Sequence, residues 1–326
     1  MKIKKILITG ANGYIGNCLF HILKAKFSVI GIDKTDNNNK KIHIINMLDK
    51  KKLDIIISKI KPDLIIHLAA QSLVDEKINK NKYFKNNIVV TKNLIDIMKK
   101  NNIKNIIFSS TASVYKKQKL ILKEKSLLKP ISTYAKTKLL CEKIIKKEIN
   151  INSVILRFFN VCSALTKPIL LGELHNPETH LIPTIVYKAI YKKKIFIYGN
   201  NFSTPDGTCI RDYIHIKDIC SAIERSIYYI QNKNKSLLVN IGNNKGISNN
   251  EIIKFIKKKI NNNLNIVFTK RRKGDIEKLV CNSNKAKKQL KWKPIYSNLN
   301  QIVNDEILWI KKLNNLKIKR KFKNYN

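Results

Sequence analysis

Short apolar runs alternate with helical patterns through the first half of the chain. The runs predict six strands, at residues 3–9, 27–33, 43–46, 64–68, 105–109 and 154–158. Between them, apolar residues recur at helical spacing near 14–26, 49–60, 84–100 and 133–149. Solid runs of isoleucine, leucine, valine and phenylalanine are typical of a parallel sheet that is covered on both faces. The pattern predicts an α/β fold with a Rossmann-type, doubly wound parallel sheet.

After residue 160 this alternation loosens, and prolines and polar loops become frequent. Shorter helices are predicted near 181–193, 217–231 and 248–261. We expect a dinucleotide-binding domain over 1–160 and a smaller α/β substrate domain over 161–326, with some exchange of chain between them. A basic tail covers about 313–326, and it is expected to be a solvated end.

The formal net charge of the 326 residues is +43, which usually suggests a nucleic-acid or membrane partner. Here the excess is almost all lysine, spread from end to end together with asparagine and isoleucine, the residues that A/T-rich codons encode. We therefore expect neither nucleic acid nor membrane as a partner. No stretch approaches the ~20 apolar residues of a membrane span. The six cysteines show no metal-binding spacing, which favours reduced thiols in a cytoplasmic protein.

A glycine-rich turn follows the first predicted strand. In "GANGYIG", Gly10, Gly13 and Gly16 would let the backbone approach a pyrophosphate at the start of a helix. Asp33 ends the second strand, where an acid binds the adenosine ribose and favours NAD over NADP. The small residues of "HLAA", Leu68, Ala69 and Ala70 after His67, end the fourth strand where a flat ring could lie. His67 itself is interpreted as structural.

The stretch "STYAKTK" contains a Tyr-x-x-x-Lys pair, Tyr134 and Lys138. Lysine follows tyrosine at this spacing four times in so lysine-rich a chain, so the spacing alone has no meaning. The context selects this pair, because Ser132 can cap a helix and Thr111 ends a strand upstream. A tyrosine activated by a lysine ammonium and a positive nicotinamide ring could act as a base near neutral pH.

Several longer stretches resemble the UDP-glucose 4-epimerase (UDP-galactose 4-epimerase) group of the extended short-chain dehydrogenase/reductase family. They are "GANGYIG", "FSSTASVY", "YAKTK", "LRFFNV", "HNPETHLIP", "TPDGTCIRDYIHIKDI" and "RRKGD". The resemblance implies that Thr111, Tyr134 and Lys138 are catalytic. The implied cofactor-binding residues are Gly10, Gly13, Tyr14, Ile15, Gly16, Asp33, Leu68, Ala69, Ala70, Asn86, Tyr134, Lys138 and Phe159. The implied substrate-binding residues are Thr111, Tyr134, Asn160, His180, Leu181, Phe196, Tyr198, Arg211, Arg272 and Asp275.

The resemblance implies reversible 4-epimerisation of UDP-glucose and UDP-galactose through a 4-keto sugar, with NAD as cofactor and a homodimer as the assembly. Related dehydratases carry an acid after the threonine, whereas this chain has Ala112 and Ser113. Leu279 stands where a larger tyrosine excludes N-acetyl sugars in some relatives, so UDP-GlcNAc and UDP-GalNAc stay open as substrates. UDP-xylose and UDP-arabinose stay open too, as does a non-catalytic protein that binds NAD or UDP.

Overall fold

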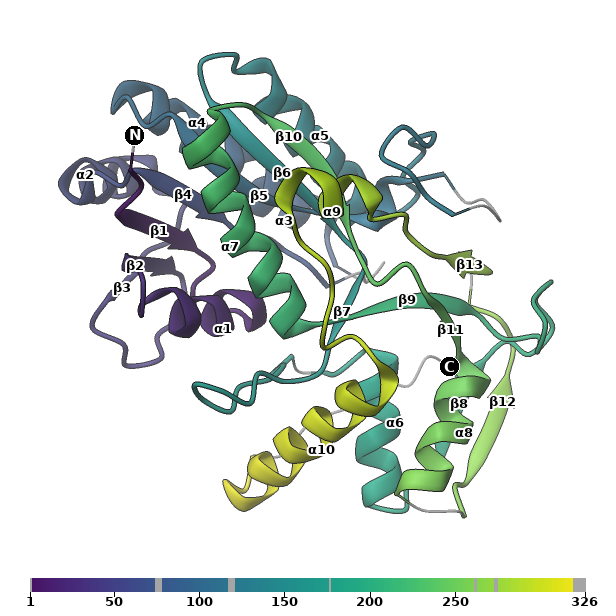
Figure 1. Ribbon diagram of the computed structural model, residues 1–326. Helices are drawn as coiled ribbons and strands as arrows, with labels where there is room; N and C mark the ends of the chain where they lie inside the picture. Colours follow the sequence, from purple (N-terminus) through teal and green to yellow (C-terminus); the bar gives the residue numbers. More distant parts are fainter. Residues whose placement is uncertain are drawn as a thin grey trace.

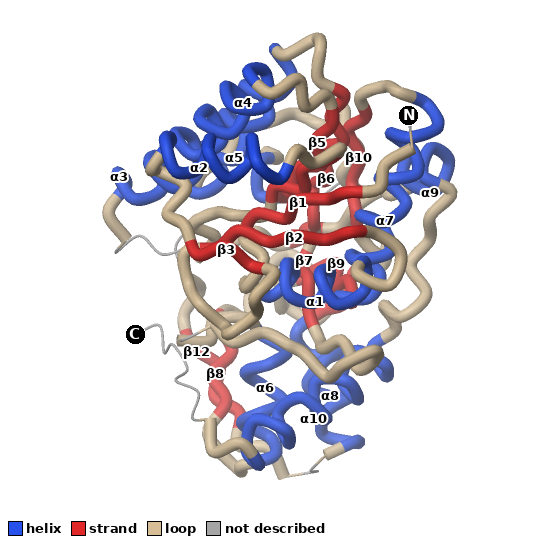
Figure 2. Tube along the Cα trace, turned by 90° about the vertical axis from the view of Figure 1, so that its left-hand side faces the viewer, coloured by secondary structure: helices blue, strands red, loops and turns tan. Residues whose placement is uncertain are grey.

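The computed structural model describes residues 2–73, 78–116, 121–175, 177–260, 263–272 and 275–318. Its main sheet consists of β1 (Lys5–Thr9), β2 (Ser28–Asp33), β3 (Ile42–Ile44), β4 (Leu64–His67), β5 (Asn105–Thr111), β6 (Asn152–Phe158) and β10 (Leu237–Ile241). The seven strands lie in the order β10-β6-β5-β4-β1-β2-β3, and every neighbouring pair is parallel. Figure 2 shows them as one layer between helices. The six predicted strands are all present.

Helices cover both faces of this sheet. One face packs against α2 (Lys50–Ile60), α4 (Val90–Lys100) and α5 (Thr133–Lys147). The other face packs against α1 (Tyr14–Leu23), α7 (Ile216–Lys233) and α9 (Asn284–Leu290). Two apolar cores, one on each face, explain why the strands are apolar without alternation. The predicted doubly wound, Rossmann-type sheet is confirmed.

The helix predicted over 84–100 is more irregular than its pattern indicated. It begins with the short α3 (Lys80–Tyr83), continues as a π-helical segment η1 (Phe84–Val89) and becomes regular only in α4. A single 3-10 turn, η2 (Ala112–Val114), follows β5 directly. Both irregular segments border the carboxyl edge of the sheet, where π-helical turns are often functional.

The second half of the chain builds two small sheets. β7 (Asn160–Cys162), β9 (Ile210–His215), β11 (Gly246–Ser248) and β13 (Lys278–Leu279) form one, and β8 (Ile195–Tyr198) pairs with β12 (Ile266–Thr269) in the other. A third apolar core joins α6 (Leu181–Ile190), α8 (Asn249–Lys259) and α10 (Leu299–Asn315). These helices lie together below the main sheet in Figure 1.

Chain from beyond residue 160 also completes the first region. The seventh strand, β10, was not predicted, and it pairs with β6 at the edge of the main sheet. α7 and α9 cover the same sheet. The division into two domains at residue 160, with some exchange of chain between them, stays a prediction. α10 runs into the expected basic tail, of which 319–326 lie outside the described residues.

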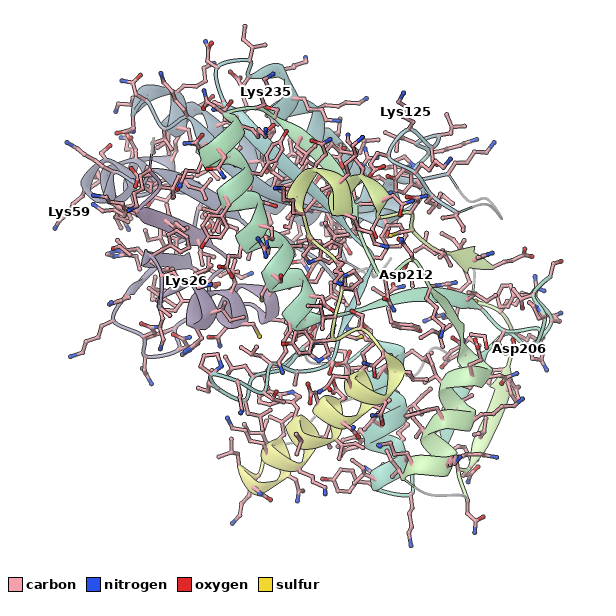
Figure 3. All side chains as sticks on the ribbon, in the orientation of Figure 1. Lys26, Lys59, Lys125, Asp206, Asp212 and Lys235 are labelled. Atoms are coloured by element: carbon pink, nitrogen blue, oxygen red, sulfur yellow. The ribbon has the colours of Figure 1, made fainter. Side chains whose placement is uncertain are left out.

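The lysines are distributed over the whole molecule. The labelled Lys26, Lys59, Lys125 and Lys235 come from four different segments and are exposed (Figure 3). Across the described ranges, no helix combines the length and the apolar character that a bilayer crossing requires. The six cysteines are all buried and carry free thiols. No cluster of side chains suited to a metal ion is found in the part of the chain that the structure describes.

Candidate functional site

The carboxyl ends of the main strands open into a cavity of about 2100 Å³. Its lining comes from the loops after β1, β2, β4 and β5 and, from the second half, from β8, β9 and the residues around 269–279. Open α/β sheets bind ligands at this edge. Every predicted site residue lines the cavity except Leu181. Leu181 begins α6 and packs against the core of the second half.

The glycine loop lines the cavity. Gly10 has a φ of 71°, and a Cβ there would lie 2.7 Å from the backbone nitrogen of Ala69. A Cβ on Gly16 would lie 2.0 Å from the carbonyl oxygen of Gly10. Gly13 precedes α1 without a side-chain cap. The first backbone N–H groups of α1 therefore stay available to an anion in the cavity.

Asp33 lies beside this loop at the end of β2. Its carboxylate accepts hydrogen bonds from the backbone N–H of Asn12 (2.9 Å) and from the hydroxyl of Thr35 (2.9 Å). The buried Oδ1 of Asn12 has no hydrogen-bond partner among the described residues. Acceptor oxygens next to a bare helix N-terminus match the ribose hydroxyls and the pyrophosphate of a dinucleotide. The residues present thus fit NAD.

Tyr134 and Lys138 are on the first two turns of α5. The hydroxyl of Ser132 caps this helix by accepting a hydrogen bond from the backbone N–H of Ala135 (3.2 Å), as predicted. Thr111 is the last residue of β5. Both Thr111 and Tyr134 line the cavity, and the Nζ of Lys138 lies 4.3 Å from the ring centroid of Phe108.

Burial acts in opposite directions on the two titrating groups. It raises the pKa of Tyr134 to about 12, although a hydrogen bond with Thr111 partly offsets this, and it lowers the pKa of Lys138 to about 8. Burial therefore disfavours the charged form of both side chains. A positive charge in the cavity, such as the nicotinamide ring expected from the sequence, would favour the phenolate of Tyr134.

His67, at the end of β4, is structural, as interpreted from its apolar surroundings. Its side chain is 1% exposed, and its two ring nitrogens lie 2.7 Å from the hydroxyl of Thr9 and 3.1 Å from that of Thr91. Burial lowers the pKa of His67 to about 3. The neutral side chain of His67, on β4, therefore connects to β1 and α4 through hydrogen bonds.

Replacing His67 with glutamine should make folding stability less dependent on pH between 7 and 5. The pKa of His67 is lower in the folded chain than in the unfolded chain, so its contribution is present above about pH 6.5 and lost as pH falls. At pH 5 the loss should be about 2 kcal/mol in the wild type and absent in the variant. Urea unfolding at both pH values checks this, and equal losses in the two proteins would contradict it.

The second half of the chain contributes the predicted arginines to the lining of the cavity. Arg211 lies on β9, and Arg272 donates from Nε (3.1 Å) and Nη2 (3.3 Å) to the two carboxylate oxygens of Asp275. The guanidinium of Arg272 also lies 5.2 Å from the ring centroid of Tyr198 on β8. Planar guanidinium groups can bind a pyrophosphate through paired hydrogen bonds. The lining around Arg211 and Arg272 therefore suits a nucleoside diphosphate.

Other lining residues were not singled out from the sequence. They include Asn12, Gln71, Ser113, Tyr115, Glu173, His175, Lys270 and Arg271. Several of them lie inside quoted motifs, so their position could have been used as a signal: Asn12, Ser113, Tyr115, His175 and Arg271. Glu173 lies in an irregular loop outside the quoted motifs, and only the fold brings it to the cavity. Asn160 lines the cavity, and its amide nitrogen donates to the carbonyl oxygen of Asp212 (3.1 Å).

Comparison with known proteins finds one matching family and relatives that share the same described activity. The family described as NAD dependent epimerase/dehydratase matches residues 6–242. A UDP-glucose 4-epimerase of Streptococcus mutans is 34% identical over 322 residues, which cover 93% of this chain and 96% of the relative. The Bifidobacterium longum UDP-glucose 4-epimerase, solved with NAD+ and UDP, is 28% identical with a TM-score of 0.88, covering 96% of this chain and 99% of that one. A Campylobacter jejuni UDP-Glc/GlcNAc 4-epimerase is 30% identical with a TM-score of 0.81, covering 95% and 99%.

Proposed function

The chain belongs to the NAD dependent epimerase/dehydratase family, and we propose that it catalyses the NAD-dependent 4-epimerisation of UDP-glucose and UDP-galactose. One observation carries this proposal. A single cavity joins the glycine loop, the Thr111–Tyr134–Lys138 group and the arginines of the second half. Such a cavity can hold a dinucleotide and a nucleoside diphosphate sugar end to end, with the reactive side chains at their junction.

The reactive side chains have separate roles in the proposal. The loop from Gly10 to Gly16 and Asp33 would hold NAD, which when bound supplies a hydride acceptor and the missing positive charge. Tyr134 removes the proton of the sugar 4-hydroxyl and later returns it, while the hydroxyl of Thr111 orients the same oxygen. The ammonium of Lys138 supports the phenolate. A 4-keto sugar results, and reduction from its other face inverts the 4-hydroxyl.

The arginines would let the sugar turn without leaving the protein. Arg211 and Arg272 are proposed to hold the pyrophosphate, with Phe196 and Tyr198 on β8 beside the base. The sugar would then rotate about its link to this fixed anchor. The residues after Thr111 are Ala112 and Ser113, and neither can serve as the acid that a dehydratase needs. Epimerisation is therefore favoured over elimination of water.

The direct test is conversion of UDP-galactose to UDP-glucose by the purified protein, first without added NAD and then with it. Turnover in both conditions is expected, because the enclosed loop should retain the cofactor. Turnover only with NAD would keep the reaction and place the weakness in cofactor retention. A folded protein that does not convert UDP-galactose in either condition would overturn the proposal.

Substrate breadth should depend on Leu279. Its side chain lines the cavity and is 9% exposed, and β13 places it in register with Arg211 on β9. We predict turnover of UDP-GalNAc by the wild type and a loss of at least about tenfold in Leu279→Tyr, because the larger ring fills the space of the N-acetyl group. UDP-galactose turnover is the internal control. A wild type that converts UDP-galactose but not UDP-GalNAc would contradict this.

We also propose a homodimer formed through η1, α4 and α5, as the family resemblance implies. Phe84 on η1 and Leu140 on α5 are exposed by 53% and 44%. Their helices pack against each other, and burial of such side chains favours association. Leu140→Glu should sediment as a monomer, whereas Ile55→Glu on α2, also exposed and apolar, should not change the mass. A monomeric wild type would contradict the dimer.

A cytoplasmic location is proposed on the buried, free state of all six cysteines. Reduced thiols are typical of that compartment. The dispersed lysines in Figure 3 also support the expectation that no nucleic acid is bound. A membrane-impermeant amine reagent, which labels exposed lysines such as Lys26 and Lys59, would test the location: labelling only after the cells are lysed is expected, and labelling of intact cells would contradict it.

A further inference from the structure

A row of buried polar side chains crosses the apolar main sheet next to the reactive residues. Ser110 on β5, Arg157 on β6 and Asn240 on β10 are neighbours in register. They are 3%, 1% and 0% exposed. Buried polar groups need partners, and this row lies one residue before the end of β5. The hydrogen-bond partners of these three side chains can therefore affect the geometry of the reactive site.

The partner is Glu142 of α5. Arg157 donates from Nε to Oε1 (2.9 Å) and from Nη2 to Oε2 (2.7 Å) of this carboxylate. The hydroxyl of Ser110 donates to the same Oε1 (2.5 Å). Both charged side chains are 1% exposed. Three hydrogen bonds thus connect α5 to β5 and β6 at one point.

The other side of Arg157 is also held. Its Nη1 donates to the carbonyl oxygen of Glu124 (3.3 Å), and its guanidinium lies 4.9 Å from the ring centroid of Tyr115. The hydroxyl of Tyr115 donates to Oδ1 of Asn240 (2.5 Å). Contacts with the sheet, with α5 and with the segment that follows η2 therefore fix the position of the Arg157 guanidinium.

The polar residues that form this contact lie close in sequence to the reactive residues, both on α5 and on β5. Glu142 is one helical turn beyond Lys138 and two beyond Tyr134, on the same face of α5. Ser110 directly precedes Thr111. Neither Glu142 nor Arg157 lines the cavity. Their effect on the reaction must pass through the side chains that do.

A buried ion pair is a poor way to gain stability. The desolvation of two charges offsets much of the free energy of their attraction. Apolar residues of similar volume often stabilise a fold equally well. The bidentate contact instead provides geometric specificity. Both hydrogen bonds between Arg157 and Glu142 can form at only one position of α5 along β6. An apolar contact would allow the helix to slide.

We propose that the Glu142–Arg157 pair positions α5 against the end of β5 and so aligns the Tyr134 hydroxyl and Lys138 with Thr111 for proton transfer. Glu142 and Arg157 are positioning residues, and the inference rests on the proposed 4-epimerase activity. A displacement near 1 Å in such a site can reduce the rate about a hundredfold. The fold would survive the loss of the pair, but the reaction would slow.

The test replaces both partners, in Glu142→Met with Arg157→Met. The urea unfolding midpoint should match or exceed that of the wild type, because no buried charge is left alone. The KM for UDP-galactose and the Kd for UDP should stay within twofold, since the arginines of the second half are untouched. The kcat should fall about tenfold to a hundredfold. A double variant with unchanged stability and a kcat within twofold of the wild type would overturn the proposal.

A second comparison applies if the double variant does not fold. Ser110→Ala removes one hydrogen bond to Glu142, and it should lower kcat severalfold without changing KM. Ser226→Ala on α7 is the matched control, because that hydroxyl is fully buried and bonds within its own helix, to the carbonyl oxygen of Ala222 (2.7 Å). Equal kcat values for the two serine variants would contradict positioning.

Failure of the proposed function would be seen separately, as a wild type without turnover of any UDP-sugar. Amide hydrogen exchange then serves as the readout for the same variants. The amides of residues 136–138 should exchange about tenfold faster when the pair is lost, while those of α7 stay unchanged. Unchanged exchange over 136–138 would contradict the proposal independently of activity.

Discussion

Replacement of Tyr134 by phenylalanine should lower kcat for UDP-galactose about a thousandfold, because the general base is removed and its ring is kept. The KM should change little, since the proposed nucleotide-binding residues on β8 and the two arginines are unchanged. Without its cofactor the protein holds the pKa of Tyr134 at about 12, so the hydroxyl is a weak base until the cavity gains positive charge. Steady-state kinetics with saturating NAD measures the effect.

The matched control is Tyr229→Phe. Tyr229 and Lys233 have the same spacing on α7, but neither residue lines the cavity. This variant should keep wild-type kcat and KM. Equal rates for the two variants would contradict the assignment of Tyr134, and a loss in both would show that position in the fold does not distinguish the pairs.

Replacement of Gly16 by alanine should be the most damaging change at the cofactor end. The new Cβ would lie 2.0 Å from the carbonyl oxygen of Gly10, which is backbone and cannot turn away. Overpacking of this kind costs about 1–3 kcal/mol, and it would displace the N–H groups proposed to bind the pyrophosphate. We expect the Kd for NAD to rise about tenfold or more and the purified variant to lose its cofactor. Calorimetric titration with NAD measures this.

Gly13→Ala provides the graded comparison, because its Cβ would lie 3.3 Å from the same oxygen. A few tenths of an ångström of movement relieve that contact, so the loss of affinity should be smaller. The two alanine variants should unfold at different urea concentrations, with Gly16→Ala the less stable. NAD affinity in Gly16→Ala equal to the wild type would contradict the role given to this turn.

Signals that are local in the sequence predicted the elements that build the reactive group. The apolar runs located the strands of the main sheet up to β6, because strands buried on both faces need no polar alternation. Ser132 marked the start of α5, since a hydroxyl before a helix caps it. The glycine loop followed from the requirement for close backbone packing at Gly16. In each case a few neighbouring residues carry the constraint.

Features that depend on distant parts of the chain were not predicted. β10 is a short run that becomes a strand only by pairing with β6, more than 80 residues earlier. Glu142 reads as one more charged residue on a lysine-rich helix until Arg157 is seen opposite it. The pKa of Lys138, which burial lowers to about 8, likewise depends on the packing around α5. Tertiary context decides all three.

The most direct measurement follows the hydrogen on the sugar C4. UDP-galactose deuterated at C4 is converted by the protein in ordinary water, and the UDP-glucose formed is analysed by mass spectrometry and NMR. In the proposed reaction that hydrogen leaves and returns as hydride inside one cavity, while Tyr134 exchanges only the hydroxyl proton. Full retention of deuterium at C4 of UDP-glucose is therefore predicted. Product carrying solvent hydrogen at C4 would contradict the account.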